Sequence, residues 1–308
     1  MEMHLPLFFG PKFSTTVRFF IGLARHRLAF RLLAPLAPRK AGDRARRLFL
    51  TPPRHRFRDA ELTALEEASP FTVSMPTGRL VGWRWGNPED PAVVLVHGWG
   101  GRAAQLRSYV APLVARGYSV VGFDAPGHGM TGGRESSVVH MASALEAVLR
   151  DVGPAEAIVG HSVGGAVAGY VLSRGAAVKK AVLLAPPASL TEYSHRFARL
   201  LRLPEGIRAL MQAQIERRFG IRWSDFEVEA TAPKLTQPAL IVHDIDDRDN
   251  PFRDGERYAR HWPGARLVAS HGLGHHGALR DSAVIHEVAA FIGSAAELGR
   301  QAPVEKLH

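Results

Sequence analysis

Six short apolar runs, separated by longer stretches with helical periodicity, dominate the pattern of this chain from residue 92 onward. The runs are AVVLVH at 92–97, YSVVGFD at 118–124, EAIVGHS at 156–162, AVLLAP at 181–186, ALIVHD at 239–244 and ARLVAS at 265–270. Runs that are apolar at almost every position are typical of strands buried on both faces of a parallel sheet. The intervening lengths mostly suit right-handed crossovers, and helical patterns occur for example at 134–151 and 282–298.

Two further segments complete the predicted sheet. FTVSM and RLVGWRWG flank Pro76-Thr77-Gly78 and predict an antiparallel hairpin ahead of the first parallel strand. The sequence therefore predicts an α/β fold, with a mostly parallel twisted sheet of about eight strands and helices on both of its faces.

The spacing of the runs also predicts the domain organisation. About fifty residues separate Pro187 from Pro238, which is too many for one crossover. Amphipathic stretches within them predict a helical lid insertion at about 188–237. We expect a basic amphipathic helical N-terminal extension at 1–70, a catalytic domain at 71–298 that contains the lid, and a C-terminal tail at 299–308.

The positive charge of the chain is concentrated near its N-terminus. Residues 1–58 hold 13 Lys and Arg against Glu2 and Asp43, whereas the remaining 250 residues sum to about −1. An apolar stretch at 17–33 is interrupted by four arginines, so we expect neither a transmembrane helix nor a secretory signal, and a cytoplasmic protein. An Arg-rich helix of this kind has two interpretations: it lies on the body of the protein, or it makes peripheral contact with an anionic membrane.

The motif Gly160-His161-Ser162-Val163-Gly164 directly follows a predicted strand and precedes a helical pattern. A sharp strand-to-helix turn of this kind presents a nucleophilic serine, and its neighbours must lack bulky side chains. The chain has no Cys, which excludes disulfides and a thiol nucleophile. We therefore predict Ser162 as a nucleophile, with the Val163 N–H at the helix start as a donor to an oxyanion.

A serine hydroxyl needs a base to remove its proton and an acid to orient that base. Both should follow the serine in the order acid, then His, each just beyond a strand. One candidate loop follows ALIVHD and contains Asp246, Asp247 and Asp249, with Asp244 at the end of the run itself. The other follows ARLVAS and contains His271, His275 and His276.

Five motifs in chain order resemble the landmarks of α/β-hydrolases, over roughly residues 71–298. They are HGWGG, GFDAPGHG, GHSVGG, IVHDIDDRDNP and GLGHHG. In that family the acid stands four residues after the His or Gly at the strand end and four before a Pro, which selects Asp247. The family's G-x-G-H pattern selects His275, with His276 as the main rival. The resemblance implies the α/β-hydrolase fold and a serine hydrolase of esterase type.

The resemblance also implies the second oxyanion donor, the N–H of Trp99. The Trp99 side chain either lines an acyl pocket or packs under the lid, and the loop from Asp124 to Gly129 resembles a structural loop of the family. The positions expected to support the nucleophile and the oxyanion loop are His97, Gly98, Gly100, Gly101, Gly160 and Gly164.

The resulting prediction is a cofactor-free and metal-free serine esterase acting on a small acyl or ester substrate through an acyl-enzyme. One alternative is a non-catalytic scaffold of the same fold that binds a small apolar ligand. Another is an NAD(P)-binding Rossmann-type protein, because the segment 98–103 satisfies G-x-G-x-x-A and Asp124 ends the next strand. No recognised nucleic-acid module accompanies the basic segment, and the Asp cluster does not fit a calcium-binding EF-hand loop.

Overall fold

A computed structural model of the chain describes residues 11–76, 78–294 and 305–306. The chain divides into two compact units. We call the first, formed by residues up to Phe49 together with Glu192–Gly220, the helical unit. We call the second, formed by Leu50–Thr191 and Ile221–His308, the sheet unit.

The described residues of the helical unit form four helices: α1 (Pro11–Leu36), α2 (Pro38–Leu50), α7 (Leu190–Leu201) and α8 (Glu205–Phe219). The last residue of α2 and the first two residues of α7 belong to the sheet unit. The strands of the sheet unit are β1 (Ser69–Met75), β2 (Gly78–Trp85), β3 (Ala92–Val96), β4 (Ser119–Asp124), β5 (Ala155–His161), β6 (Val178–Leu184), β7 (Ala239–Asp244), β8 (Ala265–Ser270) and β9 (Glu305–Lys306). Its helices are α3 (Asp59–Glu66), α4 (Val110–Val114), α5 (Val138–Val152), α6 (Val163–Leu172), α9 (Val228–Thr231), α10 (Arg253–His261), α11 (Gly274–Gly277) and α12 (Ser282–Gly293), with short 3₁₀ turns at Ala103–Tyr109, Trp223–Phe226 and Ala232–Lys234.

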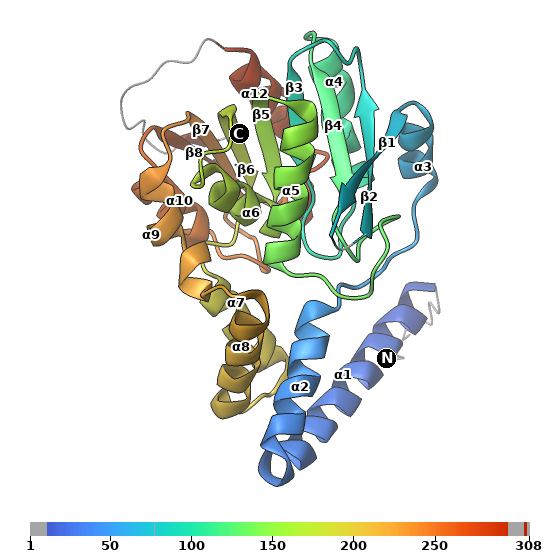
Figure 1. The fold of residues 1–308 in the computed structure, drawn as a ribbon, viewed down its shortest axis with the longest axis vertical. Coiled ribbons are helices and arrows are strands. Elements are labelled where there is room, and N and C mark those ends of the chain that lie inside the picture. Colours follow the sequence, from blue (N-terminus) through green and yellow to red (C-terminus); the bar gives the residue numbers. More distant parts are fainter. Residues whose placement is uncertain (1–10, 77, 295–304, 307–308) are drawn as a thin grey trace, which may run out of the picture. The chain divides into compact units, whose positions relative to one another are not determined.

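The sheet of the described residues has nine strands in the order β1-β2-β4-β3-β5-β6-β7-β8-β9 (Figure 1). The pairs β1–β2 and β2–β4 are antiparallel, and every other neighbouring pair is parallel. The predicted α/β fold class is confirmed. The ninth strand is two residues long and lies in the segment expected to be a tail. The sequence did not predict it, because so short a run has no recognisable periodicity.

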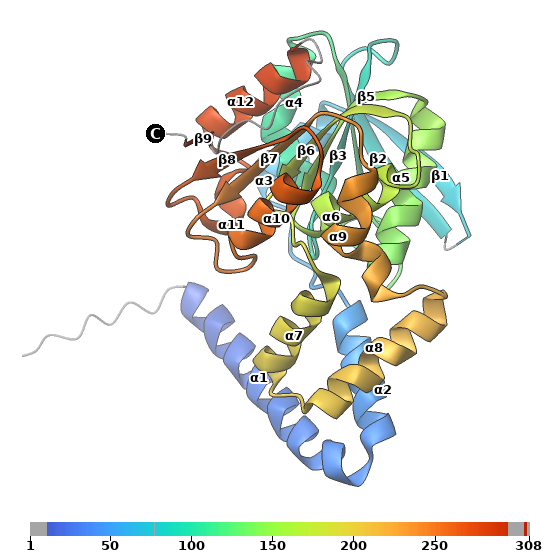
Figure 2. The same cartoon turned by 90° about the vertical axis from the view of Figure 1, so that its left-hand side faces the viewer.

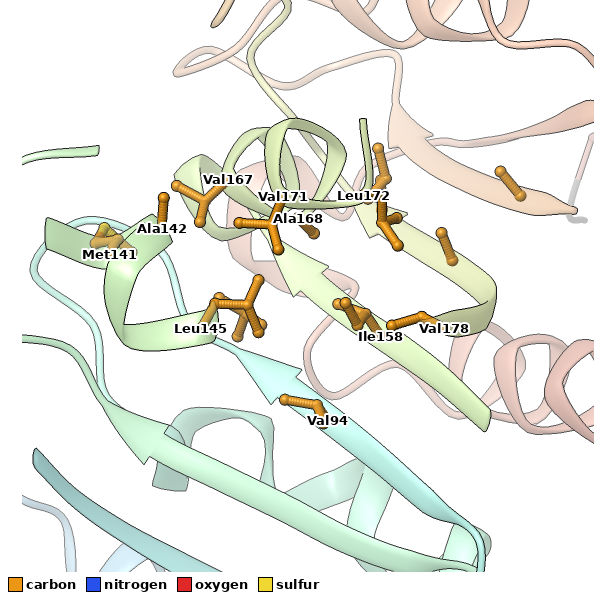
Figure 3. Packing of buried hydrophobic residues seen from close by; sticks show 14 of the residues in the cluster. Val94, Met141, Ala142, Leu145, Ile158, Val167, Ala168, Val171, Leu172 and Val178 are labelled. Carbon is orange, nitrogen blue, oxygen red and sulfur yellow. The ribbon is translucent and has the colours of Figure 1, made fainter. Parts of the chain in front are cut away.

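Two hydrophobic clusters bury the two faces of the sheet, as the uniformly apolar runs predict. Leu145 of α5 and Val167 of α6 belong to the cluster on one face and face Ile158 of β5 (Figure 3). Ser137 caps the N-terminus of α5, and its hydroxyl accepts a hydrogen bond of 3.1 Å from the His140 N–H. Gly153 caps the C-terminus of α5 with a φ of +80°, a conformation that favours glycine.

The helical unit combines the N-terminal helices with part of the predicted insertion (Figure 2). The Arg27 guanidinium of α1 donates to the Leu200 carbonyl of α7 at 3.0 Å, and the Phe49 and Phe197 rings pack edge to face. Gly42 of α2 lies so close to Leu210 of α8 that a Cβ at Gly42 would be 3.2 Å from the Leu210 Cβ. Segments about 150 residues apart in sequence therefore form one compact unit. Among the described helices, none has the combination of length and apolar character that a membrane span requires.

Replacement of Leu145 by Ala tests the packing of α5 on the sheet. Leu145 is fully buried, so Leu145→Ala should lower the free energy of unfolding by about 2–5 kcal/mol. Leu62→Ala is the control, because Leu62 is 39% exposed and should change the free energy by only about 0.5 kcal/mol. Urea denaturation measures both variants, and equal effects would contradict the packing described here.

Candidate active site

The candidate residues lie at the carboxyl ends of neighbouring parallel strands. Ser162 directly follows β5, Asp247 follows β7, and His275 follows β8. Because β5, β6, β7 and β8 are adjacent and parallel, these three loops meet at one edge of the sheet. Three positions separated by up to 113 residues in sequence are brought together in this way.

Ser162 occupies a strained turn between β5 and α6. Its φ is +53° and its ψ is −127°, which a residue with a side chain rarely adopts. The Ser162 N–H donates to the Leu184 carbonyl at 2.8 Å and so ties the turn to β6. A Cβ at Gly160 would be 2.7 Å from the Gly164 carbonyl oxygen, and one at Gly164 would be 2.5 Å from the His97 carbonyl oxygen. The two glycines of the motif are therefore required by close approach of the backbone.

The three side chains form a continuous hydrogen-bonded chain. His275 Nε2 lies 3.0 Å from Ser162 Oγ, and His275 Nδ1 lies 2.8 Å from Asp247 Oδ2. The Asp247 carboxylate accepts a hydrogen bond from Nδ1–H, which holds the proton on Nδ1 and leaves Nε2 free to accept the hydroxyl proton of Ser162. Ser162 is 8% exposed and Asp247 7%, so the interactions are largely shielded from water.

Asp247 is held in its charged form by several donors. Its Oδ1 accepts hydrogen bonds from the Asp249 N–H at 2.8 Å and from the Asn250 N–H at 2.9 Å. Burial opposes ionisation, but the hydrogen bond from His275 and these backbone donors outweigh it and hold the pKa of Asp247 below its ordinary value. A negative charge is therefore maintained beside His275.

The other acidic residues considered, Asp244 and Asp246, accept hydrogen bonds from residues at the end of β8 and in the loop after it. Asp244 accepts hydrogen bonds from the Ser270 hydroxyl at 2.8 Å and the Leu273 N–H at 3.1 Å, and thereby joins the ends of β7 and β8. Asp246 accepts a hydrogen bond of 3.0 Å from the Gly272 N–H.

His276, the rival base, lies next to His275, with the two ring centroids 5.0 Å apart. Burial lowers the pKa of His276. Among the described residues, His275 is the histidine whose ring contacts the Ser162 hydroxyl.

The expected oxyanion loop lies against the nucleophile. A Cβ at Gly98 would be 3.0 Å from the Ser162 Cβ, so a larger residue would push the loop away. The Trp99 and Val163 N–H groups donate to no acceptor within the described part of the chain. They are the two backbone donors that the sequence predicts for an oxyanion.

His97 fixes the shape of this loop. Its Nδ1–H donates to the Gly98 carbonyl at 2.7 Å, and its Nε2 accepts from the Ala125 N–H at 3.0 Å. Burial lowers the pKa of His97 to about 4, so the ring is neutral at neutral pH and can play both roles. At the other side of the loop, Gly100 has a φ of +70° and packs on Pro53. Gly101 closes the turn with a hydrogen bond of 3.0 Å from its N–H to the Gly98 carbonyl.

Asp124 is a structural residue. Its carboxylate accepts hydrogen bonds of 2.7 Å from the Ala103 and Met130 N–H groups, and it is fully buried. Burial raises the pKa of Asp124 to about 6, although the two backbone donors act in the opposite direction. The carboxylate is thus engaged by the protein's own backbone, which removes the group that a dinucleotide site would use to bind ribose.

Comparison with known proteins agrees with this architecture. The sequence model of the family described as α/β hydrolase fold matches residues 91–225. An esterase from Rhodococcus sp., RhEst1, aligns in structure over 76% of this chain and 100% of its own, with a TM-score of 0.58 and 24% identity. Residues 91–225 therefore match the α/β-hydrolase family, and the sheet unit has the α/β-hydrolase fold.

Two curated relatives match shorter regions of the chain. A serine hydrolase-like protein of Danio rerio is 33% identical over 112 residues, which are 35% of this chain and 34% of the relative. A non-heme haloperoxidase of Rhodococcus erythropolis is 35% identical over 145 residues, 45% of this chain and 49% of the relative. The chain thus spans about a third to a half of the length of these relatives.

Two residues at the candidate site were not predicted from the sequence. Asn250 is buried, and its Nδ2 donates to the Ala185 carbonyl at 2.9 Å and lies 3.5 Å from Ser162 Oγ. His161 Nε2–H donates to the His275 carbonyl at 2.9 Å, and burial lowers the pKa of His161 to about 3. Only their positions beside predicted site residues could have suggested a role, because neither type of contact leaves a sequence pattern.

Asp247, Asp249 and His275 also form a group of three potential metal ligands, with candidate atoms within 4.8 Å of one another. Two of these atoms, His275 Nδ1 and Asp247 Oδ2, already bond each other at 2.8 Å. A metal ion would have to displace this hydrogen bond, so the donor set fits the Ser162–His275–Asp247 arrangement better than a metal centre.

Three buried histidines should make the stability of the protein sensitive to acid. Burial lowers the pKa of His97 to about 4 and the pKa values of His128 and His161 to about 3, from an ordinary value of 6.5. As the pH falls below 6.5 the unfolded chain binds protons first, so each histidine should reduce the free energy of unfolding by about 1.4 kcal/mol per pH unit until its folded pKa is reached. Urea denaturation between pH 7.5 and about 4 measures this slope.

A matched pair of variants identifies the source of that slope. His128→Gln removes one buried imidazole and should flatten the dependence on pH, whereas His55→Gln changes an exposed side chain and should leave it unaltered. A stability that stays constant from pH 7 to 5 in the unaltered protein would show that these rings are not held neutral.

Proposed function

We propose that this α/β-hydrolase is a serine hydrolase that cleaves carboxylic esters through an acyl-enzyme. The observation that carries the proposal is the hydrogen-bonded chain from Ser162 Oγ through His275 to Asp247. A hydroxyl is a weak nucleophile unless a base removes its proton, and this arrangement supplies the base and the charge that orients it.

The first half of the reaction forms the acyl-enzyme. Ser162 Oγ attacks the ester carbonyl while its proton passes to His275 Nε2, and the charge on Asp247 stabilises the resulting imidazolium. The Trp99 and Val163 N–H groups stabilise the negative charge on the carbonyl oxygen. The imidazolium then gives its proton to the departing alcohol as the tetrahedral intermediate collapses.

Water completes the reaction. His275 takes a proton from the attacking water, and the second tetrahedral intermediate releases the carboxylic acid and restores the Ser162 hydroxyl. The proposed cycle uses no cofactor and no metal ion. The first substrates to test are small acyl esters, followed by thioesters and amides. Ser162 would form the same acyl intermediate with each of these classes.

Replacement of Ser162 by Ala tests the nucleophile. Hydrolysis of p-nitrophenyl acetate and butyrate should fall at least about 10³-fold, and labelling by a fluorophosphonate probe should disappear. Ser173→Ala is the control, because Ser173 lies at the opposite end of α6 and its hydroxyl donates to the Tyr170 carbonyl at 2.7 Å. Activity that survives in Ser162→Ala would exclude Ser162 as the nucleophile. A folded, unaltered protein that neither hydrolyses nor reacts would favour the non-catalytic scaffold.

Replacement of Asp247 by Asn tests the choice among the acids. The amide cannot hold the proton on His275 Nδ1 in the required way, so kcat should fall about 10³–10⁴-fold while the protein stays folded. Asp249→Asn, two residues away and exposed, should retain most of the activity. Equal losses in both variants, measured with p-nitrophenyl butyrate, would contradict the assignment of Asp247.

A further inference from the structure

The helix α1 presents apolar side chains on two opposite faces. One face is buried within the helical unit through Leu23, which is 8% exposed, and Phe30, which is 0% exposed. On the same side, His26 Nδ1 lies 3.2 Å from Arg44 Nη2, and Arg27 donates to the Leu200 carbonyl. This face holds α1 in its unit.

The opposite face is exposed although it is also apolar. Ile21, Leu28, Leu32 and Leu36 are 55%, 58%, 56% and 83% exposed. At 100° per residue these four positions fall within about 80° of the helix circumference, directly across from Leu23 and Phe30. Single exposed leucines are ordinary, but an aligned row of four is typical of a surface that binds something.

Positive charge lines this row. Arg25 lies within the arc of this row, Arg31 borders it about 60° from Leu28, and Arg39 and Lys40 follow at its C-terminal end. All four are exposed. Residues 1–58 as a whole carry 13 Lys and Arg against two acidic residues. The partner of such a surface must therefore accept apolar side chains and also carry negative charge.

We propose that α1 docks on an anionic lipid surface, with its axis in the plane of the membrane. Ile21, Leu28, Leu32 and Leu36 then enter the boundary between headgroups and acyl chains, while Arg25 and Arg31 bind lipid phosphates. The charge favours this partner over a second copy of the chain, because two such faces would bring like charges together. The helix lies on the membrane and does not cross it.

Flotation of the full chain with lipid vesicles tests the proposal. The protein should bind phosphatidylcholine vesicles that contain phosphatidylglycerol, bind vesicles of phosphatidylcholine alone far less, and lose binding at high salt. Leu28→Gln/Leu32→Gln should bind at least about tenfold more weakly, because it removes apolar surface without altering charge. Arg25→Gln/Arg31→Gln should weaken binding and reduce its dependence on salt.

The matched control is Leu62→Gln/Met130→Gln, which changes two exposed apolar residues in the sheet unit and should bind as the unaltered protein does. Circular dichroism and thermal denaturation show that each variant is folded, independently of any enzymatic activity. Absence of binding by the unaltered protein, or equal binding by Leu28→Gln/Leu32→Gln, would overturn the proposal. A dimer that forms without vesicles and is lost in Leu28→Gln/Leu32→Gln would also overturn it, in favour of self-association.

Discussion

The backbone turn at Ser162 is the constraint on which the candidate site depends. A residue with a side chain at a φ of +53° stores about 1–3 kcal/mol of strain, and the surrounding structure must hold it there. The Ser162 N–H bond to Leu184 fixes one side of the turn, and the backbone contacts at Gly160 and Gly164 leave no room for it to relax. The buried sheet thereby supplies the rigidity that the turn itself lacks.

The same turn links Ser162 to its hydrogen-bond partners. The His161 imidazole, immediately before Ser162, donates to the His275 carbonyl and so positions the backbone of the candidate base. The Asn250 side chain joins the Ser162 region to Ala185, which has its own strained φ of +50° at the end of β6. Hydrogen bonds from four neighbouring strand ends therefore restrain the position of one hydroxyl group, as preorganised catalysis requires.

The fold and the main site residues could be predicted from the sequence because each leaves a local pattern. Apolar runs such as 92–97 and 239–244, bounded by turn residues, are typical of buried strands. The glycines around Ser162 indicate a close approach of the backbone. Asp247 and His275 needed the motif resemblance as well, since Asp244, Asp246 and Asp249 are chemically equivalent in sequence. Their contacts distinguish them: Asp244 and Asp246 bond backbone or hydroxyl groups of the β8 loop, whereas Asp247 bonds His275.

Features that depend on tertiary contact could not be predicted. Asn250 Nδ2 lies 3.5 Å from Ser162 Oγ although the two residues are 88 positions apart in sequence. They meet because of the order of the strands in the sheet. The helix α1 has apolar side chains on two opposite faces, so its sequence shows no single apolar face. The sequence therefore indicated an Arg-rich helix but not which of its residues are exposed.

Every candidate site residue lies in the sheet unit. The excess positive charge is concentrated in residues 1–58, most of which belong to the helical unit. The ester proposed as substrate is neutral and has no charge for that excess to attract. The proposed contact of α1 with an anionic lipid surface accounts for both the charge and the exposed leucines.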